Sequence, residues 1–328
     1  MSDASAGAKP LRAGVVGVGS LGQHHARVYT QIPGVSLVGV VDANEQRAKE
    51  VAKRHHCQAY TDPQALLGQV DLVSIVVPTW LHFSVTRPFL QQGVHVLLEK
   101  PMTRTLEEAD ELVALAQQSG SVFQIGHIER FNEAFQELKR FLTAPGFVEV
   151  HRLGPFSQRN TDIGVTLDLM IHDLDILLHL VNSPVARVEG TGVQILSDYE
   201  DIANARLTFA NGCVANVTAS RVTLEAQRKI RIFSPGSYIS LDYQKQEMTI
   251  YRLKPGAAPN DQNLMHLIER ERLTFGKREP LMLELSAFVD SVRLGQVPEV
   301  TGEVGRQALA VALDITAQIR KQNFYARA

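Results

Sequence analysis

Over the first third of the chain, short apolar runs alternate with stretches whose apolar residues recur at helical spacing. The apolar runs are predicted to be β-strands, and they lie at residues 13–18, 35–41, 72–77, 94–98 and 121–125. Strands that alternate with helices are joined by crossover connections and form a parallel sheet. Because ligands of such sheets bind beyond the carboxyl ends of the strands, the segments that follow these runs are expected to line one crevice.

After about residue 126 the pattern changes. Helices are predicted at 132–142 and 167–181, with a strand at 148–153 between them. Further strand-like runs follow at 185–196, 202–209, 213–220, 229–233, 238–243 and 248–251. Asn211-Gly212 between two of these runs predicts a hairpin with a type I′ turn. Residues 254–279 are polar and are expected to form a long excursion before two final helices, at 280–294 and 302–322.

The change of pattern and the length of the chain together predict two domains. With 328 residues, the chain exceeds the roughly 250 to 300 residues at which a single core stops growing. Residues 1–10 are predicted to be a loose tail and residues 11–126 an α/β domain with a doubly wound parallel sheet. Residues 127–328 are predicted to be an α+β domain with a large, mostly antiparallel open sheet.

Charge and composition exclude several classes of partner. Lys and Arg total 33 against 35 Asp and Glu, so no basic excess favours nucleic acid or an anionic membrane surface. No apolar run approaches the roughly 20 residues that span a bilayer, and residues 1–10 do not resemble a signal peptide. Cys57 and Cys213 are a poor disulfide framework. These features favour a cytoplasmic protein without membrane insertion.

The first predicted strand leads into a glycine turn, Gly17-x-Gly19-x-x-Gly22. Gly17 permits a tight turn, Gly19 lets the backbone approach a pyrophosphate, and Gly22 lets the next helix pack closely on the strand. The helix that begins near Ser20 and Leu21 offers free N–H groups and the positive end of its dipole to phosphates. The turn therefore predicts a dinucleotide site, and the alternative is a glycine-rich turn without a ligand.

Asp42 ends the second predicted strand and indicates which dinucleotide is bound. A carboxylate at this spacing accepts hydrogen bonds from both ribose hydroxyls and repels a 2′-phosphate, so NAD is favoured over NADP. Arg47 lies one helical turn onward and could pair with a phosphate, which keeps NADP open as an alternative.

Glu99-Lys100-Pro101 follows another predicted strand of the first domain. A lysine at a strand end lies where ligands bind, and desolvation or a positive neighbour can bring its pKa into the range useful for proton transfer. The alternative is a solvated loop lysine. The Lys100-Pro101 bond is a candidate cis bond, which the sequence does not decide.

A second chemical cluster lies on the predicted helix 167–181. Asp168, His172 and Asp175 are spaced to share one helix face, and Asp173 points elsewhere. A carboxylate one turn from an imidazole fixes its tautomer and raises its basicity, as a general base near neutral pH requires. The alternative is a surface or capping pair. A metal site would need further ligands of suitable spacing, and none is predicted.

Taken in order, these motifs resemble the Gfo/Idh/MocA oxidoreductases, a superfamily of sugar and inositol dehydrogenases with an N-terminal Rossmann domain. The motifs are Gly17-x-Gly19-x-x-Gly22, Asp42, Pro78-Thr79-x-x-His82, Glu99-Lys100-Pro101 and Asp168-x3-His172. The resemblance implies that Lys100, Asp168 and His172 act on a substrate hydroxyl while the carbon delivers hydride to nicotinamide. Either Lys100 or His172 would be the base.

The same resemblance implies further contacts. Besides the glycine turn and Asp42, the residues expected at the cofactor are Pro78, Thr79, His82, Glu99 and Lys100. It also implies that the open face of the second sheet packs against another subunit, in a homodimer or homotetramer.

Three segments, at 126–132, 154–159 and 165–175, resemble the branch that acts on nucleotide-linked amino sugars, including the UDP-N-acetylglucosamine 3-dehydrogenases that precede an aminotransferase in lipid A synthesis. The branch implies a nucleotide-sugar substrate contacted by His127, Arg130, Asn132 and Arg159, beside Lys100, Asp168 and His172. The Gly-Gly of the family before the catalytic helix appears here only as Ile163-Gly164-Val165.

The diphosphate of such a substrate needs hydrogen-bond donors. Five arginines are candidates, although each one alone is more often a surface or ion-pair residue: Arg130, Arg152, Arg159, Arg221 and Arg228. Oxidation of UDP-N-acetylglucosaminuronic acid, of inositol or of a free sugar are alternatives within the same fold. A non-catalytic dinucleotide-sensing protein is the alternative from another class.

Overall fold

The computed structural model describes residues 9–157, 163–254, 267–276 and 278–322. The chain forms two compact units, each described here by itself. Unit 1 consists of Met1–Ile128 and Glu279–Gln307, and unit 2 of Glu129–Arg278 and Ala308–Ala328. Among the described residues, no helix combines the length and apolar character that crossing a bilayer requires.

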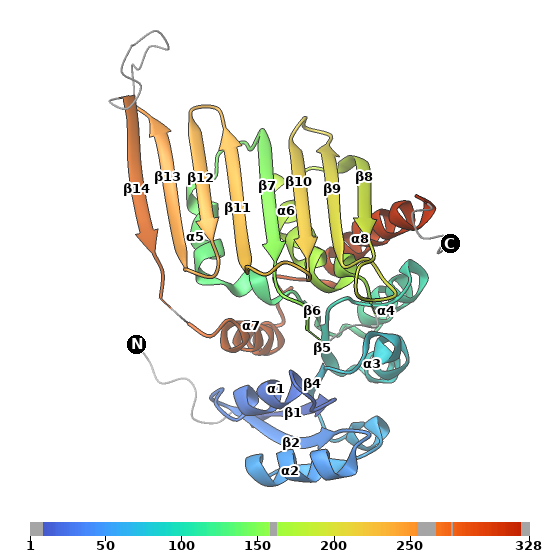
Figure 1. The fold of residues 1–328 in the computed structure, drawn as a ribbon. Coiled ribbons are helices and arrows are strands. Elements are labelled where there is room, and N and C mark those ends of the chain that lie inside the picture. The colour runs from blue at the N-terminus through green and yellow to red at the C-terminus, as the bar shows by residue number, and fades with distance from the viewer. Residues whose placement is uncertain (1–8, 158–162, 255–266, 277, 323–328) are drawn as a thin grey trace, which may run out of the picture. The chain divides into compact units, whose positions relative to one another are not determined.

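Unit 1 contains a parallel sheet whose described strands follow the order β3-β2-β1-β4-β5-β6 (Figure 1). The strands are β1 (Leu11–Val16), β2 (Val35–Val41), β3 (Gln58–Tyr60), β4 (Leu72–Ile75), β5 (His95–Glu99) and β6 (Phe123–Gly126). The predicted doubly wound parallel sheet is confirmed. The strand order reverses between β1 and β4, and ligands of such sheets bind at this switch point.

The helices of unit 1 are α1 (Gly22–Tyr29), α2 (Glu45–His55), α3 (His82–Gln91) and α4 (Leu106–Ser119). Local signals fix the ends of two of them. The side chains of Asn44 and Thr105 accept hydrogen bonds from the first turns of α2 and α4. Gly120 ends α4 at a φ of +69°, a left-handed conformation that favours glycine.

Helix α7 (Pro280–Leu294) returns to unit 1, although it follows all of the second sheet in the sequence. Leu281, Leu285, Phe288 and Val289 are buried in the same core as the strands β1 and β2. The predicted assignment of everything after residue 126 to the second domain is therefore corrected for residues 279–307. An apolar helix stripe shows that a helix packs, but not which sheet it packs on.

Unit 2 contains a sheet with the strand order β14-β13-β12-β11-β7-β10-β9-β8 over the described residues. Only β7 and β10 pair in parallel; the other described pairs are antiparallel. The strands are β7 (Phe147–Leu153), β8 (Val185–Val193), β9 (Ile202–Phe209), β10 (Val214–Ser220), β11 (Gln227–Ser234), β12 (Ser237–Asp242), β13 (Glu247–Leu253) and β14 (Ile268–Thr274). The predicted mostly antiparallel sheet is confirmed.

Two local predictions for this sheet are wrong. The predicted polar excursion contains β14, whose charged residues suit an exposed edge strand. The β9–β10 hairpin forms, but with Gly212 as its residue of positive φ, whereas a type I′ turn also needs one at Asn211. The Gly212 N–H donates to the Phe209 carbonyl, as in a type I turn followed by a left-handed glycine.

Helices cover one face of this sheet (Figure 1). They are α5 (Glu133–Phe141), α6 (Ile171–Val181) and α8 (Gly302–Lys321), of which residues from 308 onward belong to unit 2. Val148 and Val150 of β7 share a core with Leu174 and Leu177 of α6. Directly before α6, residues Thr166–Met170 form a π-helical turn, so the helix predicted at 167–181 has two parts.

The opposite face of the sheet carries an aromatic row across neighbouring strands. Phe147, Phe233, Tyr238 and Tyr251 are directly opposed in the strand register. Their ring centroids lie 5.7, 4.8 and 5.5 Å apart along the row, and the Arg270 guanidinium lies 5.7 Å from the Tyr251 ring. This aromatic row places apolar surface on a face that no described helix of unit 2 covers.

Candidate active site

The glycine turn of unit 1 is shaped by close contacts at two of its three glycines. A Cβ on Gly17, whose φ is +86°, would lie 2.3 Å from the Val76 carbonyl oxygen, and one on Gly22 would lie 1.7 Å from that of Gly17. A Cβ on Gly19 would meet only the Arg47 guanidinium, at 3.6 Å. Gly17 and Gly22 are therefore required by packing, while Gly19 leaves room for a ligand.

Helix α1 begins directly after this turn, with Leu21 as its N-cap residue and without a side-chain cap. Its first N–H groups thus have no capping side chain, as a phosphate-binding helix start requires. A hollow of about 310 Å³ opens beside it. The hollow is lined by Val18, Gly19, Ser20, Gln23, Arg47, Glu50, Val51 and Arg54. The residues of this turn fit the pyrophosphate of a dinucleotide.

Asp42 lies beside the same turn and is mostly buried. Its carboxylate accepts the backbone N–H groups of Val18, at 3.1 Å, and Asn44, at 2.9 Å. The Arg47 guanidinium lies 3.3 Å from it. Arg47 is therefore paired with the carboxylate that NAD requires, and this pairing opposes its use as a 2′-phosphate ligand.

His82 begins α3 but does not face a ligand. Its side chain is buried, and its ring nitrogens lie 2.9 Å from the carbonyl oxygens of Val77 and Pro101. These carbonyls belong to the loops that follow β4 and β5. The expected direct contact of His82 with the cofactor is therefore wrong. The His82 ring instead links the two loops that carry Pro78, Thr79 and Lys100.

The Lys100-Pro101 peptide bond is cis, and the Lys100 side chain is partly buried. Beside it, Glu99 accepts the Lys100 backbone N–H at 3.2 Å and lies 3.3 Å from the buried His25 of α1. Burial acts to raise the pKa of Glu99, but the contact with His25 and the charges of His25 and Lys100 outweigh it, so this pKa is lowered. The Glu99 carboxylate is charged and fixed in place.

A second buried carboxyl group, Glu284 of α7, faces this cluster. Within the described part of the chain, neither of its carboxyl oxygens has a hydrogen-bond partner. Burial, and then the charge of Glu99, raise the pKa of Glu284 well above its ordinary value. The surroundings of Glu284 therefore favour its neutral form in the folded protein. The sequence offered no signal for this group, because α7 could not be assigned to unit 1.

Glu284→Gln is expected to stabilise the protein increasingly as pH rises. Above about pH 4.5 the unfolded chain releases the Glu284 proton that the native state retains, so the wild type loses up to about 1.4 kcal/mol per pH unit until the native group ionises. The glutamine variant lacks this loss. Denaturant titrations from pH 4 to 8 measure it, with the exposed Asp290→Asn of the same helix as control. A constant difference across this range would contradict the assignment.

In unit 2, Asp168 lies in the π-helical turn and His172 in the first turn of α6. Asp168 is buried and His172 half-buried. The start of this helical segment is fixed by Glu200, which accepts the N–H of Thr166 at 3.3 Å. A Cβ on Gly164 would lie 2.1 Å from the Glu200 carboxylate, so a larger residue at this position would displace the Glu200 side chain. Sequence reasoning missed Glu200.

Two buried ion pairs hold α6 in place. Arg130 donates to the Asp175 carboxylate at 2.6 and 2.9 Å, and Arg152 donates to Asp173 at 2.7 and 2.8 Å. Arg152 also donates to Glu129 at 2.9 Å. Burial raises the pKa of Asp173, and the Arg152 charge opposes this shift.

These pairs correct two expectations. Arg130 is 2% exposed, and its Nε and Nη2 donate to Asp175, so its expected substrate contact is replaced by a buried ion pair. Asp175 is paired with Arg130 and does not join Asp168 and His172 in one reactive cluster. The sequence shows these charged residues but does not show which of them form ion pairs with each other.

The other residues predicted to contact the substrate lie in different surroundings. Asn132 caps α5, where its side-chain oxygen accepts the Ala134 N–H at 3.1 Å, so this oxygen has a structural role. His127 is buried just after β6. Arg221 is held by Asp201 at 2.8 Å. Arg159 lies outside the described residues.

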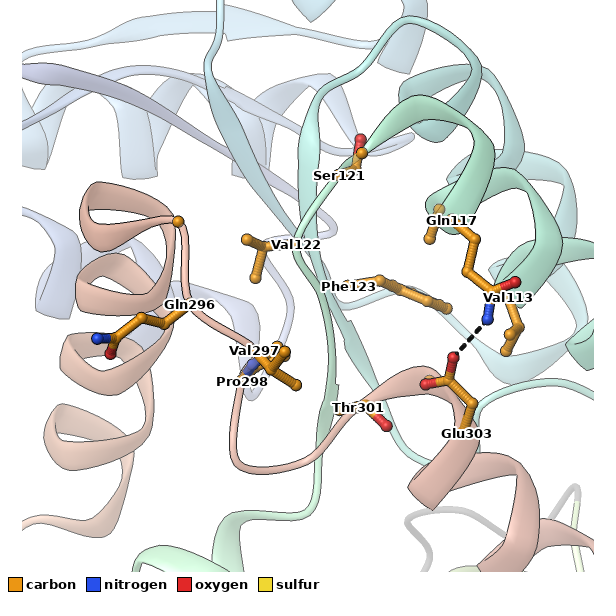
Figure 2. A pocket seen from close by; sticks show the side chains of 14 residues that line it. Val113, Gln117, Ser121, Val122, Phe123, Gln296, Val297, Pro298, Thr301 and Glu303 are labelled. Carbon is orange, nitrogen blue, oxygen red and sulfur yellow. Dashed lines mark hydrogen bonds between the residues drawn. The ribbon is translucent and has the colours of Figure 1, made fainter.

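Another pocket of unit 1, of about 280 Å³, lies at the start of the edge strand β6 (Figure 2). It surrounds Val122 and Phe123, where β6 begins, whereas the glycine turn follows the end of β1. A hydrogen bond from Gln117 to Glu303 borders it. This pocket is therefore separate from the candidate cofactor site. Among the described residues, no group of three or more His, Cys, Asp or Glu side chains could hold a metal ion.

Comparison with known protein families finds a match in each of the two units. Residues 11–127 match the oxidoreductase family with an NAD-binding Rossmann fold, and residues 141–237 match the GFO/IDH/MocA C-terminal domain. The UDP-N-acetylglucosamine 3-dehydrogenase of Acidithiobacillus ferrooxidans is 41% identical over 310 residues, covering 94% of this chain and 97% of that protein. The chain belongs to the Gfo/Idh/MocA oxidoreductase family.

A solved structure of this enzyme and a further relative are also similar to the chain. A solved structure of the Acidithiobacillus ferrooxidans enzyme, GnnA, matches with a TM-score of 0.88, covering 95% of this chain and 98% of that chain at 40% identity. The scyllo-inositol 2-dehydrogenase (NAD(+)) of Bacillus subtilis is 29% identical, covering 94% of each chain. Membership makes this protein an oxidoreductase whose Rossmann domain binds NAD, as the glycine turn and Asp42 predicted.

Proposed function

We propose that this protein oxidises the 3-hydroxyl of UDP-N-acetylglucosamine to the 3-keto sugar, with NAD as the oxidant. The observation that carries the proposal is the 41% identity, over 94% of the chain, to a UDP-N-acetylglucosamine 3-dehydrogenase. The 3-keto product suits an aminotransferase, so a role in 2,3-diamino sugar synthesis for lipid A, in the cytoplasm, is part of the proposal.

In this proposal His172 takes the hydroxyl proton. Asp168, one turn earlier, orients the imidazole and raises its basicity. Lys100, at the end of β5, polarises the hydroxyl oxygen. Its position is fixed by Glu99 and by the hydrogen-bonded ring of His82. Bound NAD accepts the hydride from the sugar carbon. Arg159 and His127 are proposed to contact the substrate.

Initial rates of NADH formation test the substrate. We expect the highest kcat/KM with UDP-N-acetylglucosamine, compared with its uronic acid, free N-acetylglucosamine and myo-inositol. A preference for the uronic acid or for inositol would replace the proposed substrate by another of the same fold. No NADH with any of the four, despite NAD binding, would favour a non-catalytic dinucleotide sensor.

We further propose that the aromatic row pairs two copies of the chain in a homodimer or homotetramer. Phe233 is exposed and the other three rings of the row are partly exposed, so together they form apolar surface that a second copy would bury. Tyr238→Glu is expected to lower the molar mass in light scattering, whereas Lys53→Glu on α2 is expected to leave it unchanged. A monomeric wild type would contradict the proposal.

A further inference from the structure

The arginines of unit 2 differ in whether their donors are engaged. Arg130, Arg152 and Arg221 are all buried, and each forms a short ion pair with an aspartate. Arg228 is the exception among the described candidates. Its side chain is 51% exposed, and its nearest carboxylate, Glu129, lies 4.0 Å away, beyond hydrogen-bond distance. Within the described residues, none of the five N–H donors of the Arg228 guanidinium has a hydrogen-bond partner, so these donors suit a ligand.

Arg228 is also placed beside the helix that carries His172. It lies on β11 directly opposite Arg152 in the strand register, and β11 is the neighbour of β7 in the sheet (Figure 1). Arg228 alternates in phase with the buried Ile230 and Ile232, so it faces the helix-covered side of the sheet. Arg152 binds Asp173, the residue next to His172.

The charges around Arg228 leave its guanidinium weakly neutralised. Arg152 takes up the carboxylates of both Asp173 and Glu129 with hydrogen bonds of 2.9 Å or less. Arg228 contributes only its longer-range charge to these two groups. A planar, partly exposed guanidinium with free donors suits phosphate oxygens, which accept two parallel hydrogen bonds from it.

We propose that Arg228 binds the diphosphate of the nucleotide-sugar substrate. This inference rests on the proposed function and makes Arg228 the residue that distinguishes a nucleotide-linked sugar from a free one. The sequence offered Arg228 as one of five candidate arginines, with Arg159 favoured among them. Burial and pairing exclude three of these for a ligand contact.

Steady-state kinetics test the proposal. Arg228→Met is expected to raise KM for UDP-N-acetylglucosamine about 10- to 100-fold, the effect of losing a hydrogen bond to a charged group, with KM for NAD unchanged. The rate with free N-acetylglucosamine, which has no diphosphate, is expected to stay the same. Arg228→Lys should keep part of the affinity. Arg231→Met is the matched control, because Arg231 pairs with Glu149 on the opposite face of the same sheet.

Calorimetric titration with UDP alone separates this proposal from the proposed function. We expect the wild type to bind UDP and Arg228→Met to bind it about 10- to 100-fold more weakly, with unchanged melting temperature. Equal UDP affinity in both proteins, or no UDP binding by the wild type, would overturn the role of Arg228. UDP binding that depends on Arg228 would support that role even if UDP-N-acetylglucosamine is not oxidised, an outcome that would reject only the proposed reaction.

Discussion

Replacing Lys100 or His172 by alanine is expected to lower turnover of UDP-N-acetylglucosamine by about 10²-fold or more. Each substitution removes a group proposed to move or stabilise the hydroxyl proton in the transition state. NADH binding, measured by fluorescence titration, should persist, because the glycine turn and Asp42 are untouched. The loss is therefore expected in kcat and not in cofactor affinity.

Two substitutions of exposed residues serve as controls for the Lys100→Ala and His172→Ala variants. His179→Ala changes an exposed histidine of the same helix α6, and Lys53→Ala an exposed lysine of α2. Both are expected to retain wild-type turnover. Near wild-type rates in both Lys100→Ala and His172→Ala would reject the proposed roles of these residues.

Arg130→Met is expected to destabilise the protein by about 3–5 kcal/mol. Arg130 and Asp175 are 2% and 1% exposed, and removing one partner leaves the other charge buried and unpaired. Denaturant unfolding measures the loss. The double variant Arg130→Met/Asp175→Leu should recover most of it, since no buried charge then remains.

The exposed pair of Arg140 and Glu137 provides the comparison. Its arginine side chain is 72% exposed, so Arg140→Met is expected to cost less than about 1 kcal/mol. A loss of similar size in Arg140→Met and Arg130→Met would contradict the argument that burial makes the difference.

The elements of both sheets were predictable because strand and helix patterns are local. The strand at 202–209 and the helix at 280–294 were predicted with their observed bounds. Their partners were not predictable in the same way. The apolar stripe of α7 packs on unit 1, and only the three-dimensional contacts of Leu285 and Phe288 reveal this.

The residues of the candidate site also divide into those that the sequence could predict and those that it could not. Motif spacing located the glycine turn, Asp42 and the Glu99-Lys100-Pro101 segment, because these depend on backbone conformation next to a strand end. Pairing of charges was not predictable, because Arg130 and Asp175 are 45 residues apart and meet only in the fold. His82 shows the same limit: its motif is recognisable, but its ring binds two carbonyls and not a ligand.

Helices α7 and α8 complete different cores from the end of the chain. Leu285 and Phe288 of α7 belong to the core of unit 1, and Ala312 and Ile315 of α8 belong to that of unit 2. During synthesis on the ribosome, neither core can close until these helices have emerged, so the nascent chain exposes apolar surface of both sheets until late. A fragment that ends before residue 279 would therefore lack part of both cores.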